Sequence, residues 1–362
     1  MIFFFNRFTN YYSLRINLLM KKIKSFGLIS LLFTSFLVAQ TKTETQISSN
    51  NEVSYINTIT ASELKAHLSI VASDSMEGRD TGSEGQKKAG RYLVEQYKKE
   101  GIPFPKGADS YYQKVPAAFM NRDSGENLPD SANIWAFIEG SEKPNEIVVV
   151  SAHYDHVGIK NGEVYNGADD DGSGTVSLLE IAQAFQKAKK EGHGPKRSIL
   201  ILHMTGEEHG LYGSSYYSEN PLFPIANTVA DVNIDMIGRR DDFHKKSNNY
   251  VYLIGSDYLS TDLYKICESV NSKYIHLNLD YKFNDRKDPN RFYYRSDHYN
   301  FAKHGIPVVF LFNGVHDDYH QASDEVDKIE FDALTKRAQL GFSIAWELAN
   351  RDARIVVDKD GN

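Results

Sequence analysis

The stretch IVVVSAHYD, residues 147–155, decides the fold, because a mostly apolar run ends there in a histidine and an acid. An apolar run without polar alternation is typical of a strand that is covered on both faces of its sheet. Similar apolar runs predict further strands at residues 133–138, 198–204, 229–234, 250–254 and 308–312.

Helical patterns lie before, between and after these runs. Residues 60–63 have the spacing of a capping box and open a helix that carries Leu64, Leu68 and Val71 on one face. Further helices are predicted at residues 84–100, 173–190, 259–273 and 331–349. Strands that alternate with helices predict an α/β fold, a three-layer α/β/α sandwich around a mostly parallel mixed sheet.

The N-terminal region reads as a processing signal. Lys21, Lys22 and Lys24 precede an apolar stretch of 13 residues, 26–38, which is followed by Ala39. This order is typical of a secretory signal peptide, and the stretch is shorter than the ~20 residues that span a bilayer. We therefore expect a chain that is exported to the periplasm or secreted, with no stable membrane anchor after cleavage. The predicted organisation is a signal peptide at 1–40 with a possible unused upstream start at 1–19, a linker at 41–55, a single domain at 56–350 and a polar tail at 351–362.

Composition excludes several kinds of partner and site. The 362 residues carry 41 Lys plus Arg against 48 Asp plus Glu, a formal charge of -7, which argues against a nucleic-acid partner. Cys267 is the single cysteine, so neither an intramolecular disulfide nor a Cys-rich zinc site can form. Any metal ion must be held by histidines and carboxylates.

Acids and histidines follow four of the predicted strands. In open α/β sheets, ligand sites lie beyond the carboxyl ends of the strands, so these groups are expected to converge on one crevice. The acidic loop GADDDGSG, residues 167–174, joins them. Histidines and carboxylates without thiolates suit one or two divalent ions, zinc first and Mn²⁺ or Co²⁺ next. The groups that follow the strands are His153 and Asp155, Glu207 and Glu208, Asp235, and residues 317–320.

A hydrolase with two metal ions needs a specific set of ligands. One carboxylate is shared between the ions, further ligands complete each site, and a bridging water becomes acidic enough to ionise near neutral pH. Two histidines, two terminal carboxylates and one bridging carboxylate suffice. A further carboxylate that stays off the metal ions can move the proton, and the neighbours Glu207 and Glu208 offer this division.

Taken in order along the chain, these motifs resemble the M28 family of zinc aminopeptidases, in particular its exported bacterial members. The resemblance covers roughly residues 64–349. It rests on residues 77–79 and 81–83, His153-Tyr154-Asp155, the loop 167–174, Gly206-Glu207-Glu208, residues 233–236, Ser296-Asp297-His298, and Tyr319-His320 with Asp324.

The resemblance implies a role for each site residue. His153 and Asp235 would bind one zinc ion, Glu208 and His320 the other, and Asp169 would bridge the two, with a cis peptide bond after it. Glu207 would be the general acid/base, and Tyr293, with Tyr294 as a rival, would stabilise the oxyanion. Asp155 and Asp324 would orient the ligands His153 and His320.

The implied activity is hydrolysis of N-terminal peptide bonds, through a metal-bridging hydroxide, in peptides with a free N-terminus. Carboxypeptidase or dipeptidase activity remains open, because the core motifs are shared, and so does a metal-free binding module on the same fold. Glutaminyl cyclase activity is less favoured, since such relatives use one zinc ion and have Asp-Ser where this chain has Asp169-Asp170. His203 is predicted to be a core histidine, and His156 and His209 are predicted to be packing or rim residues.

Overall fold

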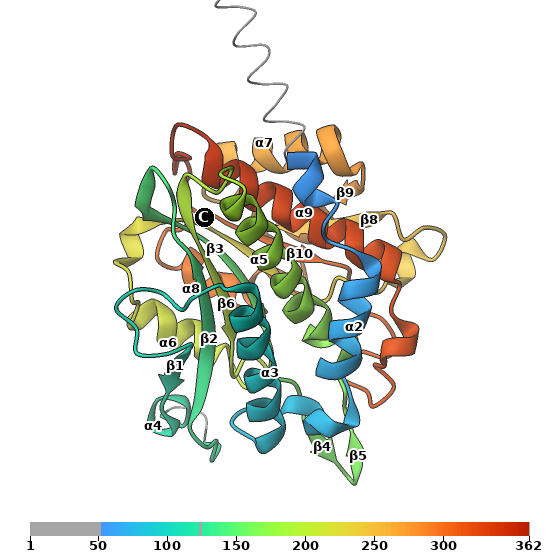
Figure 1. The fold of residues 1–362 in the computed structure, drawn as a ribbon. Coiled ribbons are helices and arrows are strands. Elements are labelled where there is room, and N and C mark those ends of the chain that lie inside the picture. Colours follow the sequence, from blue (N-terminus) through green and yellow to red (C-terminus); the bar gives the residue numbers. More distant parts are fainter. Residues whose placement is uncertain (1–51, 123–124, 362) are drawn as a thin grey trace, which may run out of the picture. The chain divides into compact units, whose positions relative to one another are not determined.

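The structure, a computed structural model, describes residues 52–122 and 125–361. Residues Val53–Asn362 form one compact unit (Figure 1). The predicted signal peptide and most of the predicted linker lie outside the described residues. Within the described part of the chain, no helix has the length and apolar character needed to cross a membrane.

An eight-stranded mixed sheet forms the centre of the unit, in the order β1-β2-β6-β3-β7-β10-β8-β9. Its four central strands, β6, β3, β7 and β10, run parallel, whereas β1, β2 and β8 add antiparallel neighbours toward the edges. The predicted α/β fold with a mostly parallel mixed sheet is confirmed. The strands are β1 (Tyr112–Val115), β2 (Ser131–Ile138), β3 (Lys143–His153), β6 (Arg197–Met204), β7 (Thr228–Ile234), β8 (Tyr250–Ile254), β9 (Asn278–Asp280) and β10 (Val308–Phe312), with a separate hairpin of β4 (Ile159–Lys160) and β5 (Glu163–Val164).

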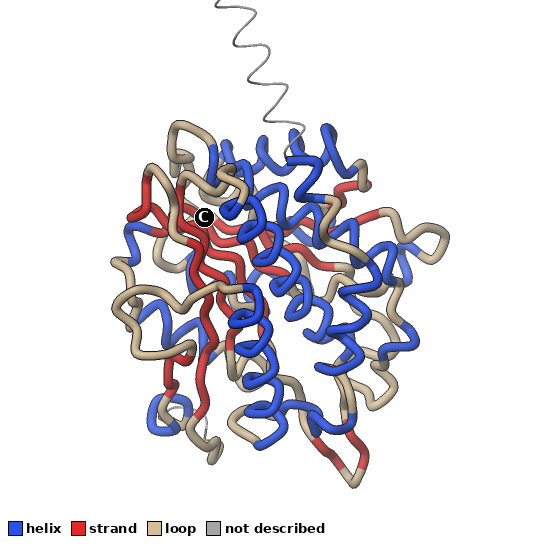
Figure 2. Tube along the Cα trace, viewed as in Figure 1, coloured by secondary structure: helices blue, strands red, loops and turns tan. Residues whose placement is uncertain are grey.

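Helices cover both faces of this sheet. Alternate residues of β3 belong to two different cores. Val148 and Val150 pack in one with the larger helices, and Ile147 and Val149 pack in the other with two of the smaller ones, those that carry Tyr217 and Phe301. Figures 1 and 2 show the larger helices in front of the sheet. The larger helices are α2 (Ala61–Val71), α3 (Glu84–Glu100), α5 (Gly174–Lys190), α7 (Thr261–Val270) and α9 (Phe331–Asn350); the smaller ones are α4 (Ala117–Met120), α6 (Tyr212–Glu219) and α8 (His298–Ala302).

Local capping fixes where the first helices begin and end. Thr60 Oγ1 accepts a hydrogen bond from the backbone N–H of Glu63, and Ser83 caps α3 in the same way. Gly101, at φ 70°, ends α3 in the left-handed region that glycine adopts without strain. The predicted starts of α2 and α3 are therefore confirmed.

The ends of the folded unit differ from the predicted boundaries. Tyr55, placed in the linker by sequence, is 1% exposed and packs its ring 5.5 Å from that of Trp346. In the predicted polar tail, Arg354 donates to the carbonyl of Ala226 and Ile355 is buried. The folded unit thus extends beyond 56–350 at both ends.

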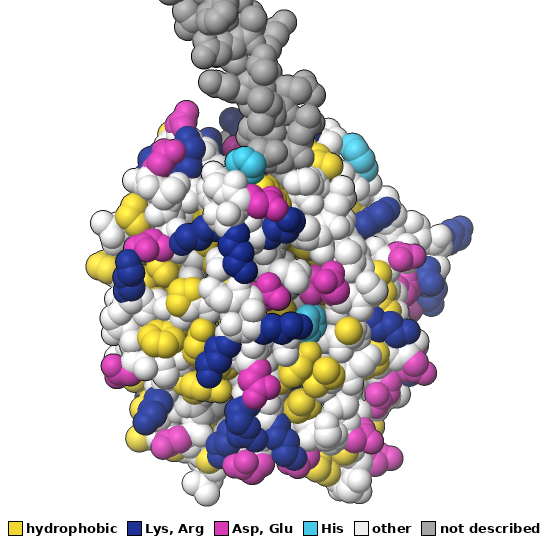
Figure 3. All heavy atoms as spheres, viewed as in Figure 1, with side chains coloured by type: hydrophobic (Ala, Val, Ile, Leu, Met, Phe, Trp, Pro, Cys, Tyr) yellow, Lys and Arg dark blue, Asp and Glu magenta, His cyan; other side chains and the backbone are white. Residues whose placement is uncertain are grey.

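Basic and acidic side chains are interspersed over the face shown in Figure 3. That face carries no continuous basic stripe of the kind that nucleic-acid binding requires.

Candidate metal centre

The site forms at the carboxyl ends of the four parallel central strands. His153 is the last residue of β3, and Asp235 directly follows β7. Glu207 and Glu208 follow β6, and His320 lies in the loop after β10. Asp170 belongs to the loop that leads into α5. The parallel arrangement brings these groups together, as the strand ends predicted.

A first cluster consists of His153, Asp170 and Asp235. His153 Nε2 lies 3.3 Å from Asp170 Oδ1 and 3.6 Å from Asp235 Oδ1. All three side chains are buried, and their ligand atoms lie within 4.8 Å of one another. The spacing suits a divalent ion, since two donors at ~2.1 Å from zinc in tetrahedral geometry are about 3.4 Å apart.

A second cluster consists of His156, Asp170, Glu208 and His320. His320 Nε2 lies 3.0 Å from Asp170 Oδ2 and 2.9 Å from Glu208 Oε2. His156 Nδ1 lies 2.6 Å from Glu208 Oε1 and 3.8 Å from Asp170 Oδ2. The two oxygens of Asp170 thus face different clusters, which is the arrangement of a bridging carboxylate.

Buried atoms of both clusters fit metal ions. No hydrogen bond of ordinary geometry with another described residue satisfies His153 Nε2, His156 Nδ1, Asp170 Oδ2 or Glu208 Oε1. Buried polar atoms normally have partners, so a group of orphaned ligand atoms at one point indicates that something else binds there. The donors are imidazole nitrogens and carboxylate oxygens, which suit zinc.

Asp170 replaces Asp169 as the candidate bridge, and this corrects the sequence prediction. Asp169 Oδ1 accepts a hydrogen bond from the backbone N–H of Gly238 at 2.6 Å, and its Oδ2 lies 3.1 Å from His316 Nε2. Both oxygens are therefore engaged away from the clusters. The cis peptide bond is Asp170-Asp171, one residue later than predicted. The sequence could not show which of the three consecutive aspartates is the bridge, because the backbone conformation of the loop decides which side chain faces the crevice.

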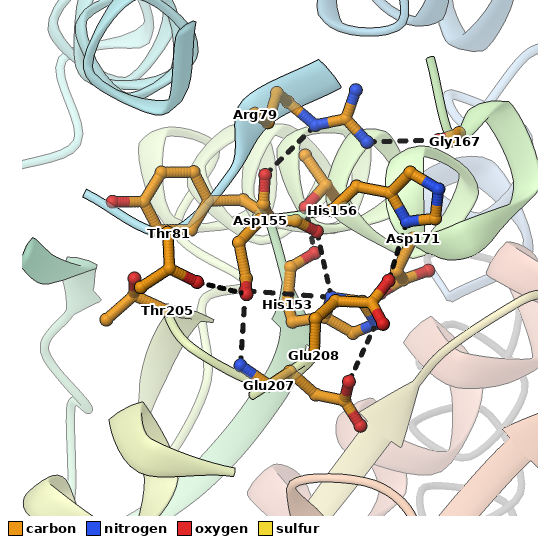
Figure 4. A network of polar contacts seen from close by, with 12 residues as sticks. Arg79, Thr81, His153, Asp155, His156, Gly167, Asp171, Thr205, Glu207 and Glu208 are labelled. Atoms are coloured by element: carbon orange, nitrogen blue, oxygen red, sulfur yellow. Dashed lines mark hydrogen bonds and ion pairs between the residues drawn. The ribbon is translucent and has the colours of Figure 1, made fainter. Parts of the chain in front are cut away.

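Of the two predicted orienting acids, Asp155 lies against its expected partner, with its Oδ1 3.8 Å from His153 Nδ1. The backbone carbonyl of Asp155 lies 3.1 Å from His153 Nδ1, while its carboxylate accepts from Thr81 Oγ1 and from the backbone N–H of Glu207 (Figure 4). Asp155 therefore contacts both His153 and Glu207.

Asp324 orients the bridging loop and, among the residues that the structure describes, forms no hydrogen bond or ion pair with His320. Its Oδ2 accepts from the backbone N–H groups of Asp169 and Asp170, at 3.0 and 3.1 Å. The predicted pairing of Asp324 with His320 is corrected: Asp324 holds the peptide from which Asp170 projects.

Glu207 and Glu208 differ in electrostatics although they are adjacent. Burial raises the pKa of Glu207 well above its usual value, and the negative charges of Asp235, Glu208 and Asp297 raise it further, against the opposing effect of His153. Burial would also raise the pKa of Glu208, but His156 and His320 hold it at about 2. Neighbouring carboxylates with separated pKa values are typical of a ligand beside a proton carrier.

Residues 133–344 match the family model described as Peptidase family M28. The chain belongs to this family. Leucine aminopeptidase 1 of Penicillium rubens is 27% identical over 63% of this chain and 60% of its own length. Leucine aminopeptidase 1 of Sclerotinia sclerotiorum is 25% identical over 80% of this chain and 72% of its own length. A probable zinc metalloprotease of Pyrenophora teres f. teres is 35% identical over 30% of this chain and 22% of its own length. Two of these three relatives are thus covered over less than two thirds of their length.

Solved structures share the M28 fold of this chain. The Legionella pneumophila LapA aminopeptidase superposes with a TM-score of 0.63 at 22% identity, covering 84% of this chain and 75% of that one. The zinc aminopeptidase BSAP from Bacillus subtilis superposes with a TM-score of 0.61 at 17% identity, covering 83% of this chain and 99% of that one. The glutaminyl cyclase of Porphyromonas gingivalis superposes with a TM-score of 0.61 at 20% identity, covering 79% of this chain and 97% of that one. At these identities the likeness concerns the fold.

Tyr319, rather than Tyr293, lies at the site of this M28 chain. Tyr293 is 8% exposed, and its ring packs 4.2 Å from that of Tyr258 in an aromatic cluster. Tyr319 stacks on His320 at 3.9 Å and lines the cavity beside Glu207. Burial and the nearby charge of Asp170 raise the pKa of Tyr319, so its hydroxyl keeps its proton. The predicted role of Tyr293 is thereby corrected, and the rival Tyr294 is also absent from the cavity lining. In the sequence, the one indication that Tyr319 belongs to the site is that it directly precedes the predicted ligand His320.

Two adjoining cavities open at the M28 site. A small one of about 30 Å³ lies against the clusters, and a larger one of about 600 Å³ adjoins it. Both are lined by Phe292, Arg295, Val315 and Tyr319. The small cavity combines site carboxylates with an apolar wall that is made of Met236, Phe292, Phe310, Phe312 and Val315.

Proposed function

We propose that this M28 chain is an exported zinc aminopeptidase that uses two ions. The observation that supports it best is the position of Asp170, whose two oxygens face two clusters of candidate ligand atoms. The relatives named leucine aminopeptidase support the activity. Export rests on the signal-like pattern of residues 20–39.

Zinc ions bound to these clusters would lower the pKa of water and polarise the scissile carbonyl. The first ion would be held by His153 and Asp235, the second by Glu208 and His320, and Asp170 would be shared. Three of these ligands, His153, Asp170 and Glu208, each have a buried atom without a hydrogen bond of ordinary geometry to a described residue, which favours a metal-binding enzyme over a metal-free binding module.

Glu207 carries the proton in this proposal. Its Oε2 lies 3.9 Å from His153 Nε2, and Asp155 fixes its backbone N–H. Its raised pKa favours taking a proton from water, and bound cations would bring that pKa back toward neutrality. Glu207 then delivers the proton to the amine that leaves.

Tyr319 and the apolar wall act on the substrate. The Tyr319 hydroxyl accepts a hydrogen bond from Arg295 Nη2 at 3.2 Å and still has its own proton to donate to a developing oxyanion. Phe310 and Phe312 belong to a buried strand, so the floor of the small cavity is apolar. We therefore expect substrates with an apolar N-terminal residue, whose free amine is held by the site carboxylates.

A panel of reporter peptides tests this function. Leucyl reporters with a free amine, the same reporters with an acetylated amine, and peptides with a reporter on the C-terminal residue are assayed with and without chelator. We expect turnover of the free-amine reporters alone, lost on chelation and restored by zinc. Turnover of the C-terminal reporters would support carboxypeptidase activity instead. No turnover of any peptide by zinc-loaded protein would support a binding module.

A further inference from the structure

His156 occupies a position that its predicted role as a packing or rim residue does not explain. The side chain is fully buried, and its ring lies directly against Gly167 at the start of the bridging loop. A Cβ atom on residue 167 would lie 2.5 Å from ring atoms Cγ and Cδ2 of His156. The ring is therefore packed closely against this loop, and Figure 4 shows it turned toward Glu208.

The ring of His156 faces carboxylates without forming a hydrogen bond of ordinary geometry to them. Nδ1 points at the second cluster, 2.6 Å from Glu208 Oε1 and 3.8 Å from Asp170 Oδ2. Neither Nδ1 nor Nε2 makes a hydrogen bond of ordinary geometry with a described residue. A buried imidazole that is aimed at two carboxylates in this way resembles a ligand more than a packing residue.

The surroundings of His156 are built to hold it. The buried guanidinium of Arg79 donates to the carbonyls of Tyr154, on the segment that carries His156, and of Asn166 and Gly167, at the start of the bridging loop. Arg79 thus fixes the segment that carries His156 to the segment that carries Asp170. Such support is typical of a ligand whose ring must keep its orientation.

We propose that His156 is a third histidine ligand of the metal centre, at the second cluster. This inference rests on the proposed function, since it requires metal ions at the site. It makes the two metal sites unequal: the second would have two imidazoles, Glu208 and a share of Asp170, whereas the first would have one imidazole, Asp235 and the other share. The second site thus offers four protein ligands against three at the first, so we expect it to take up the first zinc ion.

X-ray absorption spectroscopy on the wild-type protein tests this directly, because multiple scattering counts imidazoles around zinc. With two equivalents of zinc we expect about 1.5 imidazoles per ion, since three histidines serve two ions. With one equivalent we expect about two per ion, since the histidine-rich site fills first. About one imidazole per ion at both loadings would overturn the proposal.

Variants give a second, independent readout. His156→Phe keeps a ring of similar size, and His209→Ala is the matched control because its Nε2 is directed to Asp80, at 3.0 Å. By competitive chelator titration, the tighter zinc site of His156→Phe is expected to weaken by at least about 10- to 100-fold, while His209→Ala keeps both affinities. An unchanged tight site in a folded His156→Phe protein would overturn the proposal.

The outcomes separate this inference from the function on which it rests. Wild-type protein that binds no zinc overturns both. Wild-type protein that binds two zinc ions with about one imidazole each overturns only the role of His156 and leaves the proposed aminopeptidase intact.

Discussion

The single substitutions Asp170→Asn and Asp169→Asn test which of the two adjacent carboxylates bridges the metal ions. The two side chains are adjacent in sequence and both buried, yet their contacts differ completely. Asp170 faces His153 and His320, whereas Asp169 binds the backbone of Gly238 and contacts His316. The same substitution should therefore have different consequences at the two positions.

The magnitudes follow from these contacts. Asp170→Asn removes the negative charge that two ions would share, so we expect both zinc affinities to fall and kcat/KM to drop at least about 100-fold, more than the 10- to 100-fold typical of residues behind the ligands. Asp169→Asn keeps an oxygen for the Gly238 N–H but loses the charge. Hydrogen bonds to charged groups contribute roughly 1.5–3 kcal/mol and neutral ones roughly 0.5–1.5 kcal/mol, so the free energy of unfolding should fall by about 1–2 kcal/mol.

Metal analysis after gel filtration in dilute chelator, steady-state kinetics and urea unfolding provide the assays. Asp169→Asn should retain two zinc ions per chain and most of the activity, and Asp170→Asn should retain neither. If Asp169→Asn lost the ions while Asp170→Asn kept them, the assignment of the bridge would be refuted.

Three further predictions concern the oxyanion, the substrate pocket and acid stability. Tyr319→Phe should lower kcat by about 10²–10³-fold with the metal content unchanged, whereas Tyr293→Phe should leave kcat nearly at the wild-type value. Because the cavity wall is apolar, kcat/KM for a leucyl reporter should exceed that for an aspartyl reporter by roughly 10–200-fold. Burial lowers the pKa of His203 to about 3. Between pH 6.5 and that value, His203 is neutral in the folded protein and protonated in the unfolded chain. The free energy of unfolding therefore falls as the pH falls, by about 1.4 kcal/mol per pH unit for this group. His203→Gln lacks this titrating group, so its free energy of unfolding should fall less with pH than that of the wild type. Urea unfolding at pH 7, 6 and 5 should therefore show a narrowing difference between the two proteins.

Each of these predictions has a contradicting result. Equal effects of the two tyrosine substitutions would remove the distinction between them, and a preference for the aspartyl reporter would contradict the apolar pocket. A constant gap in unfolding free energy between His203→Gln and the wild type at all three pH values would show that His203 is not held neutral by the fold.

The sequence predicted the strands that carry the site because their signal is local and strong. The run before His153 is apolar apart from Ser151, and its assignment to a strand needed no tertiary information. The helix at 84–100 carries its own caps, Ser83 and Gly101, so its bounds were readable. By contrast, β1 and β9 have three or four residues each and exist through pairing with neighbouring strands, which no local pattern encodes.

The site residues divide in the same way. His153 and Asp235 lie directly at strand ends, so the topology alone places them. Asp169 and Asp170 lie in a loop, where one step along the backbone turns a side chain from the crevice to Gly238. His156 is brought to the second cluster by the path of the chain after β3, and Tyr293 is withdrawn by aromatic packing. These outcomes depend on tertiary contacts, and no motif spacing fixes them.

The central claim is that Glu207 moves the proton while other residues hold the ions. The most direct measurement is kcat of Glu207→Gln on a leucyl reporter, with zinc counted in the same sample. We predict a loss of about 10²–10⁴-fold in kcat with both ions retained, because glutamine keeps the shape but cannot take up a proton. A variant that keeps both zinc ions and turns over near the wild-type rate would contradict the account.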